Sequence, residues 1–181
     1  MQRYIAFMRA LNVGGHTVKM DHLRSLFEAL GFSGVESFIA SGNIIFESPS
    51  TDTAVLEERI ERHLKESLGY EVATFVRTPA EVAAAAAHTP FAGADPVPEG
   101  HTLQVVFLKT APGAEVKEKV SALRTDYDEL HIHGRELYWW CQGRSSDSLI
   151  KPGRMDKALG TPGTARNVTT VRKLAAKYPA S

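Results

Sequence analysis

The order of structural patterns in the first 78 residues most constrains what this chain can fold into. Apolar residues recur at intervals of three and four over residues 20–30 and 55–68, and each of these helix patterns ends at a glycine. β-prone apolar runs flank the two helices at residues 4–11, 35–40, 44–46 and 72–76. This β-α-β-β-α-β order predicts an α+β fold whose N-terminal domain is ferredoxin-like.

The predicted topology brings two polar segments to one edge of the sheet. With right-handed crossovers, the first and second strands run parallel and the third lies between them. The loop over residues 12–19 and the turn over residues 41–43 are therefore expected side by side. Gly42-Asn43 suits a tight turn that needs a positive φ. The first strand is apolar on both faces, so we expect the rest of the chain to cover its second face.

The second half of the chain repeats the strand, helix and hairpin order. A helix is predicted over residues 79–87, and a segment rich in proline, glycine and acidic residues follows it. A strand at 103–108, a helix at 115–123 and a hairpin through Gly134-Arg135 come next. Because Gly42 and Gly134 align, we interpret this half as a degenerate duplication, ferredoxin-like in derivation, without a clear fourth strand and ending in helices at 155–159 and 168–177. The predicted domains are residues 1–88 and 103–181, joined by a linker at 89–102.

Composition excludes some broad classes of function. The 21 Lys and Arg residues equal the 21 Asp and Glu residues in number, so no overall charge draws the chain toward nucleic acid or a membrane. Cys141 is the single cysteine and has no partner for an intrachain disulfide. The first residues lack the cationic and apolar regions of a secretion signal, and no apolar run reaches about 18 residues. We therefore expect a cytoplasmic protein, a monomer or weak homodimer, with no membrane partner.

The glycine loop is the main candidate site. Two consecutive glycines before a helix can turn backbone N–H groups toward an anion, and nearby cations and polar turn residues can add to this. The alternative is that the glycines only permit an awkward loop, since the full phosphate-loop spacing is missing. We favour a non-enzymatic or regulatory binder of an anionic, phosphate-bearing ligand. Its candidate residues are Arg9, Asn12, Gly14, Gly15, Lys19, Ser41 and Asn43, with Arg166 and Asn167 as possible additions.

Two other functions remain open from the sequence. One is an enzyme acting on a nucleotide or phosphorylated small molecule, for which His16 in the glycine loop is the candidate base. The other is nucleic-acid binding through residues 144–181, which hold eight basic and two acidic residues, a net charge of +6. No recognisable catalytic motif occurs, the catalytic residues stay unknown, and no cofactor is predicted.

The second hairpin carries further chemistry-bearing side chains. His131 and His133 alternate on one strand face, and Glu136 lies across the turn, which is a conceivable three-ligand metal site. An exposed hairpin face is the favoured interpretation, so no metal is predicted. Tyr138-Trp139-Trp140 is assigned to packing rather than to base or sugar stacking, and Cys141 to a buried apolar position.

Four sequence motifs together resemble a known family. They are Arg9-Ala10-Leu11-Asn12-Val13-Gly14-Gly15, Lys19-Met20, Ser41-Gly42-Asn43 and Thr164-Ala165-Arg166-Asn167. The combination is similar to the bacterial family known as domain of unknown function 1697, over nearly the whole chain. The resemblance implies a two-part α+β fold with a ferredoxin-like N-terminal half, and it implies no established reaction. After Asn167 the family's usual tryptophan-asparagine pair is replaced by Val168-Thr169.

Overall fold

A computed structural model describes residues 1–9, 11, 15, 17–39 and 42–180. The chain divides into two compact units, which are described in turn. The first comprises residues 1–82 together with 178–181, and the second comprises residues 83–177. Among the described residues, none of the helices combines the length and the apolar character needed to cross a membrane.

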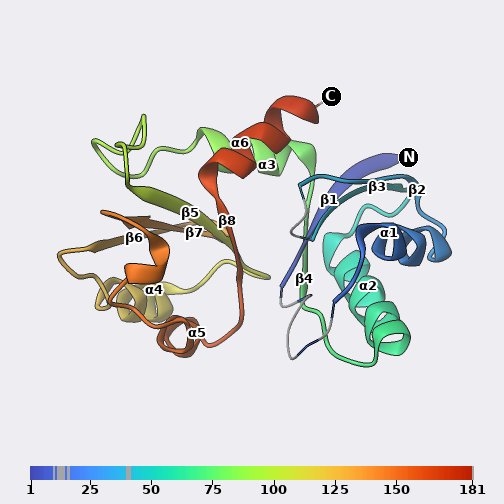
Figure 1. The fold of residues 1–181 in the computed structure, drawn as a ribbon, viewed down its shortest axis with the longest axis horizontal. Helices are drawn as coiled ribbons and strands as arrows, with labels where there is room; N and C mark the ends of the chain where they lie inside the picture. Colours follow the sequence, from blue (N-terminus) through green and yellow to red (C-terminus); the bar gives the residue numbers. More distant parts are fainter. Residues whose placement is uncertain (10, 12–14, 16, 40–41, 181) are drawn as a thin grey trace. The chain divides into compact units, whose positions relative to one another are not determined.

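The first unit has the predicted ferredoxin-like topology (Figure 1). Its sheet has the strand order β2-β3-β1-β4 with antiparallel neighbours, so β3 separates the parallel strands β1 and β2 as expected. The strand β2 ends at Ser37, three residues before the predicted end. The elements are β1 (Gln2–Met8), α1 (Met20–Ala29), β2 (Ser33–Ser37), β3 (Asn43–Ser48), α2 (Thr53–Leu68) and β4 (Thr74–Arg77).

Helices α1 and α2 pack on one face of this sheet and form the core with it. Tyr4, Ala6 and Met8 of β1 belong to this core together with the buried faces of both helices. The other face of β1 is buried as well, since Ile5 and Phe7 are fully inaccessible. Which segment covers this second face stays a prediction.

Local signals fix where α2 begins and ends. Asp52 accepts hydrogen bonds from the backbone N–H groups of Ala54 and Val55 at 2.9 and 3.3 Å, which caps the helix start. Gly69 ends the helix in the left-handed conformation, with φ of 86°.

Two glutamates of α2 accept hydrogen bonds from backbone N–H groups on the outer edge of β4. Glu57 Oε2 accepts the N–H of Val76 at 2.8 Å, and Glu61 Oε2 accepts that of Thr74 at 3.0 Å. Edge strands expose such N–H groups to pairing with other chains. These carboxylates therefore have a structural role that the sequence did not predict.

Tyr178, which directly follows the last helix of the second unit, packs in the first unit. Its hydroxyl donates to Glu36 Oε2 at 2.7 Å, its ring meets Phe38 edge-on with centroids 6.2 Å apart, and the Arg3 guanidinium lies 5.5 Å from its centroid. Burial and Glu36 raise the pKa of Tyr178 to about 12. The chain thus returns to its first unit after completing the second.

The second unit repeats the topology of the first. Its strand order, β6-β7-β5-β8, matches β2-β3-β1-β4 position by position. The hairpin β6–β7 turns at Gly134-Arg135, as predicted, and pairs His133 with Glu136. The boundary between the two units falls within the helix α3 (Pro79–Ala87). The remaining elements are β5 (Thr102–Phe107), α4 (Ala114–Ser121), β6 (Asp128–His133), β7 (Glu136–Cys141), the 3₁₀ turn η1 (Ser145–Asp147), α5 (Pro152–Leu159), β8 (Thr164–Asn167) and α6 (Val168–Lys177).

The strand β8 corrects the prediction that this half lacks a clear fourth strand. Its four residues alternate between buried and exposed, and they pair antiparallel with β5. Gly163, just before the strand, lies close against β5. A Cβ there would lie 2.7 Å from Val106 Cγ1 and 2.9 Å from Leu108 Cδ2. β8 can therefore approach β5 only because this position has no side chain.

Replacing Gly163 with alanine should lower the free energy of unfolding by about 1–3 kcal/mol, the usual range for overpacking a core. Gly153 in α5 has open space around its Cβ position and no positive φ, so Gly153→Ala serves as the matched control. That control should leave stability unchanged or raise it by up to about 1 kcal/mol. Urea unfolding of both variants measures the difference, and equal stability of the two would contradict the packing argument.

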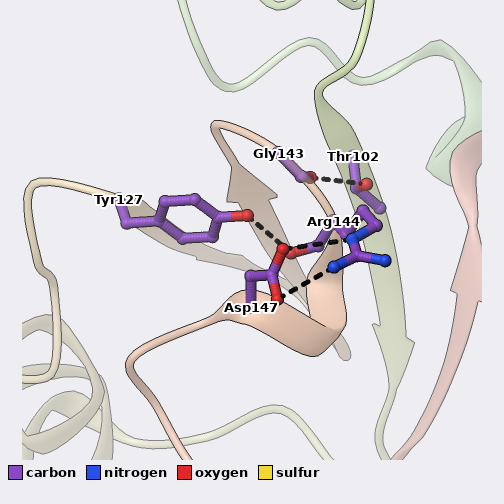
Figure 2. A network of polar contacts seen from close by, with 5 residues as sticks. All are labelled: Thr102, Tyr127, Gly143, Arg144 and Asp147. Carbon is purple, nitrogen blue, oxygen red and sulfur yellow. Dashed lines mark hydrogen bonds and ion pairs between the residues drawn. The ribbon is translucent and has the colours of Figure 1, made fainter.

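A polar network fixes the loop that follows β7 (Figure 2). Tyr127 donates its hydroxyl to the carbonyl of Arg144 at 2.6 Å, and Thr102 donates to that of Gly143 at 2.8 Å. The Arg144 guanidinium contacts both carboxylate oxygens of Asp147, at 3.1 and 3.4 Å. Arg144, one of the cations in the basic C-terminal segment, is therefore ion-paired within this network.

Candidate functional site

The end of β1 and the β2–β3 connection lie side by side, as the topology predicted. Phe7 pairs with Asn43, and the N–H of Met8 donates to the carbonyl of Gly42 at 3.0 Å. Gly42 has φ of 77°, and a Cβ there would lie 3.4 Å from Met8 Cβ. We call this part of the first unit the loop edge, and its described residues are 9, 11, 15, 17–19, 38–39 and 42–43.

The glycine loop is anchored where it leaves and re-enters the core. Leu11 and Val18 are each 6% exposed and belong to the core of the first unit. Tyr70 also donates its hydroxyl to the carbonyl of Leu11 at 2.6 Å. Between these anchors, Gly15 is exposed with φ of 82°, and no described residue lies within 4 Å of a Cβ built there. Gly15 thus adopts the left-handed conformation that glycine favours.

The helix α1 starts at this edge with Lys19 at its N-cap position. Lys19 is exposed, and among the described residues no side chain caps the helix. Asp21 in the first turn is ion-paired with Arg24, which offsets its negative charge. Uncapped N–H groups and the helix dipole favour an anion at such a terminus. Arg9, half-buried at the end of β1, brings a second cation to the same edge.

The loop edge also holds an unusual backbone conformation. Ile39 has φ of 54° and is 47% exposed. A β-branched side chain is strongly disfavoured at positive φ, and strained positions of this kind cluster at ligand sites. An exposed, strained apolar residue next to the turn thus marks the same edge independently.

Asn43 has a mainly structural position. It is fully buried, and its Nδ2 donates to the carbonyl of Phe38 at 3.0 Å, which closes the β2–β3 connection. Asn12, Gly14 and Ser41, as well as the candidate base His16, lie outside the described residues.

Arg166 and Asn167 belong to β8 in the second unit. Arg166 is 9% exposed and donates to Thr164 Oγ1 at 2.8 Å and to the carbonyl of Ala165 at 2.9 Å. Burial lowers the pKa of its guanidinium to about 10. Asn167 is exposed, and its Oδ1 accepts the N–H of Thr169 at 2.9 Å at the start of α6. Both residues thus contribute to local structure.

The basic C-terminal segment is less available than its composition suggests. Arg166 is buried, and Arg172 lies 3.5 Å from Asp95, an acidic residue outside this segment. A net charge of +6 counted from the sequence therefore overstates the cations that this segment presents to phosphates.

A buried carboxylate at the start of β6 collects several hydrogen bonds in the second unit. Asp128 is fully buried, and burial alone would raise the pKa of its carboxyl. Hydrogen bonds from Ser148, Trp139, Thr125 and Cys141 outweigh burial and hold that pKa below its usual value. Its donors include Ser148 Oγ at 2.6 Å, Thr125 Oγ1 at 2.8 Å, Trp139 Nε1 at 2.8 Å and the Leu149 N–H at 3.3 Å.

The side chains of β7 have packing roles, as predicted. Cys141 is fully buried, and burial together with Asp128 raises the pKa of its thiol to about 12, which makes it a poor nucleophile. Trp140 is half-buried and donates its Nε1 to His101 Nδ1 at 3.1 Å. The side chains of both tryptophans are thus held within the second unit.

The structure also brings together three histidines that the sequence did not associate. His88 lies against His131 and His133, whereas Glu136 is not part of the group. Burial lowers the pKa of His88 and His131, and the neighbouring imidazoles lower it further. No local motif could have indicated His88, which lies 43 residues before His131 in the chain.

Comparison with known proteins fits this two-unit fold. The family model described as a protein of unknown function, DUF1697, matches residues 1–138. The chain belongs to this family. The predicted family is therefore confirmed, and with it the α+β fold class, although the DUF1697 description assigns no reaction.

A solved structure is similar over almost the whole chain. It is the conserved bacterial protein SP0830 from Streptococcus pneumoniae, which is 26% identical, with a TM-score of 0.72 and coverage of 96% of this chain and 97% of that one. No curated protein matches the chain. The similarity to this solved structure thus extends through both units, beyond the 138 residues that the family model covers.

Proposed function

We propose that this DUF1697 protein binds a small anionic, phosphate-bearing ligand at the loop edge, as a non-enzymatic or regulatory binder. The observation that carries the proposal is the α1 N-terminus, which no described side chain caps and where Lys19 is exposed. Arg9 at the end of β1 and the exposed Gly15 with its positive φ support it. The strained, exposed Ile39 on the neighbouring turn supports it further.

The proposed residues divide by role. Lys19 and Arg9 supply charge, and the backbone N–H groups of the glycine loop and of the first turn of α1 supply directed donors. For Asn43, which is buried and donates to the Phe38 carbonyl, we propose a role in positioning the turn. Arg166 and Asn167 belong to β8 of the second unit, and we propose them only as additions to the main set. We place the protein in the cytoplasm, which its single cysteine supports.

Replacing Lys19 with alanine should remove the thermal stabilisation that inorganic phosphate, pyrophosphate or a nucleoside phosphate gives the wild-type protein. The exposed side chain makes no hydrogen bond with a described residue, so the fold should be retained. Adding Arg9→Ala should abolish any residual effect. Thermal shift with each anion measures this, and mass spectrometry of the purified protein first checks for a copurified ligand.

The matched control is Arg62→Ala on α2, an exposed cation in the same unit and away from the loop edge. It should preserve the response to anions. Equal loss in Lys19→Ala and Arg62→Ala would indicate general charge screening and would overturn the proposal. Crystals grown with sulfate provide a second test, since an edge filled by the protein's own side chains would leave no room for an anion.

A further inference from the structure

The C-terminal end of α3 is fixed over the β6–β7 hairpin of the second unit. Tyr138 of β7 is 1% exposed, and its hydroxyl donates to the carbonyl of Ala85 at 2.9 Å. The N–H of His88 donates to the carbonyl of Ala84 at 3.1 Å, so the helical turn continues to His88. His88 is therefore held about one turn beyond the anchored Ala85, against the hairpin.

Two strand residues meet His88 there. His131 and His133 are two apart on β6, so both side chains project from the same face of the sheet. The ring centroids of His88 and His133 are 3.9 Å apart with an interplanar angle of 12°, and those of His88 and His131 are 5.7 Å apart. One ring nitrogen from each of the three lies within 4.8 Å of the other two.

One side of the three-histidine group is buried, and the other side is exposed to solvent. His88 Nε2 is buried and has no hydrogen-bond partner in the described part of the chain. Such atoms are uncommon in folded proteins and call for an explanation. His131 and His133 are exposed, so an ion can reach the group from solvent and their rings can change rotamer. Phe91, with its ring 6.4 Å from that of His131, adds an apolar wall.

We propose that His88, His131 and His133 form a binding site for a zinc ion. Imidazole nitrogen suits Zn²⁺, and three histidines with a fourth position open to water or an added ligand are a known zinc arrangement. Tetrahedral bonds of 2.0–2.1 Å place two ligand atoms roughly 3.4 Å apart. The nitrogens therefore need to approach by on the order of 1 Å, which rotation of the two exposed side chains supplies.

The proposed site differs from an ordinary surface histidine pair in its third ligand. Two exposed histidines on one strand bind divalent metals weakly by themselves, whereas His88 directly follows α3, whose Ala85 carbonyl accepts a hydrogen bond from Tyr138. Zinc should therefore tie the end of α3 to the hairpin and stabilise the second unit. This consequence makes His88 the decisive residue for testing the site.

The test uses the full chain with any histidine tag removed and the metal stripped by a chelator. Zn²⁺ is titrated by calorimetry and in competition with a chromophoric chelator, and Co²⁺ is followed by its visible spectrum. We expect one equivalent per chain and an increase in melting temperature. Replacing His88 with glutamine, or His131 or His133 with alanine, should weaken binding on the order of 100-fold or more, since even outer-sphere changes cost about 10- to 100-fold.

The control is His22→Ala, an exposed histidine on α1 in the first unit, which should leave zinc affinity unchanged. His131 and His133 are exposed, so their alanine variants should fold and keep the test valid even if His88→Gln does not. Substoichiometric binding, or affinity that survives either the His131 or the His133 substitution, would overturn the proposal. A folded His88→Gln variant with wild-type affinity would also overturn it, because the strand pair alone would then hold the ion.

Discussion

Replacing Asp128 with asparagine should lower the free energy of unfolding by about 3 kcal/mol or more. The carboxylate is fully buried and accepts hydrogen bonds from the side chains of Thr125, Trp139 and Ser148. Hydrogen bonds to a charged group contribute about 1.5–3 kcal/mol each, and an amide removes the charge and turns a donor toward groups that are themselves donors. Urea unfolding at pH 7 measures the loss, which is a large fraction of a typical 5–15 kcal/mol total.

The pH dependence of this effect follows from the direction of the pKa shift. The pKa of Asp128 is lower in the folded protein than the ordinary value of 3.8, so its stabilisation is fully present above that value. The contribution falls as pH drops through the folded-state pKa. The difference in stability between wild type and Asp128→Asn should therefore shrink in acid.

The control is Asp126→Asn, at an exposed neighbouring position, which should change stability by less than about 0.5 kcal/mol. An equal effect of the two substitutions would refute the role of the buried carboxylate.

Replacing Glu57 with alanine should lower the free energy of unfolding by about 1.5–3 kcal/mol. The carboxylate is 4% exposed and accepts the backbone N–H of Val76 at 2.8 Å, and alanine would leave that donor without this acceptor. Chemical unfolding measures the loss, and Glu58→Ala on the same helix is the exposed control.

A glutamine variant separates the loss of the hydrogen-bond acceptor from the loss of side-chain packing. Glu57→Gln keeps the side-chain length and a carbonyl acceptor, so it should recover part of the stability. The alanine variant also leaves the outer edge of β4 with a free donor, and edges of this kind pair with other chains. We therefore expect faster aggregation of Glu57→Ala by light scattering. Equal loss in the glutamine and alanine variants would mean that the charge, and not the acceptor for β4, carries the effect.

Elements with strong local signals were predicted well from the sequence. The α2 helix has regular apolar spacing, an aspartate cap and a terminal glycine, and the β6–β7 hairpin has a two-residue turn beginning at Gly134. Each of these signals acts within a few residues, so it is visible without knowledge of the fold. The neighbouring positions of the β1 end and the β2–β3 turn also followed, because topology alone determines them.

The features that were missed depend on contacts between distant segments. The strand β8 has only four residues, two of them exposed, and its pairing depends on the space that Gly163 leaves against β5. His88 lies beside His131 and His133 because Tyr138 anchors the end of α3. The apolar spacing of a helix in the sequence does not reveal such an anchor. Asp128 and Glu57 are acidic residues that composition assigns to the surface, yet each satisfies buried donors. The location of the loop edge followed from the sequence, whereas the hydrogen bond from Asn43 to the Phe38 carbonyl, which holds the turn there, did not.

The return of the chain to its first unit at Tyr178 has a consequence for biosynthesis. Translation completes the four strands of the first unit at Arg77, but the tyrosine that contacts Arg3, Glu36 and Phe38 follows only 101 residues later. At about 5–20 residues per second, that interval lasts roughly 5–20 s on the ribosome. During it, the nascent first unit has its sheet but not its final contact. Tyr178 therefore adds its contacts to a sheet whose strands were synthesised well before it, and a chain terminated before this tyrosine lacks the contacts with Arg3, Glu36 and Phe38.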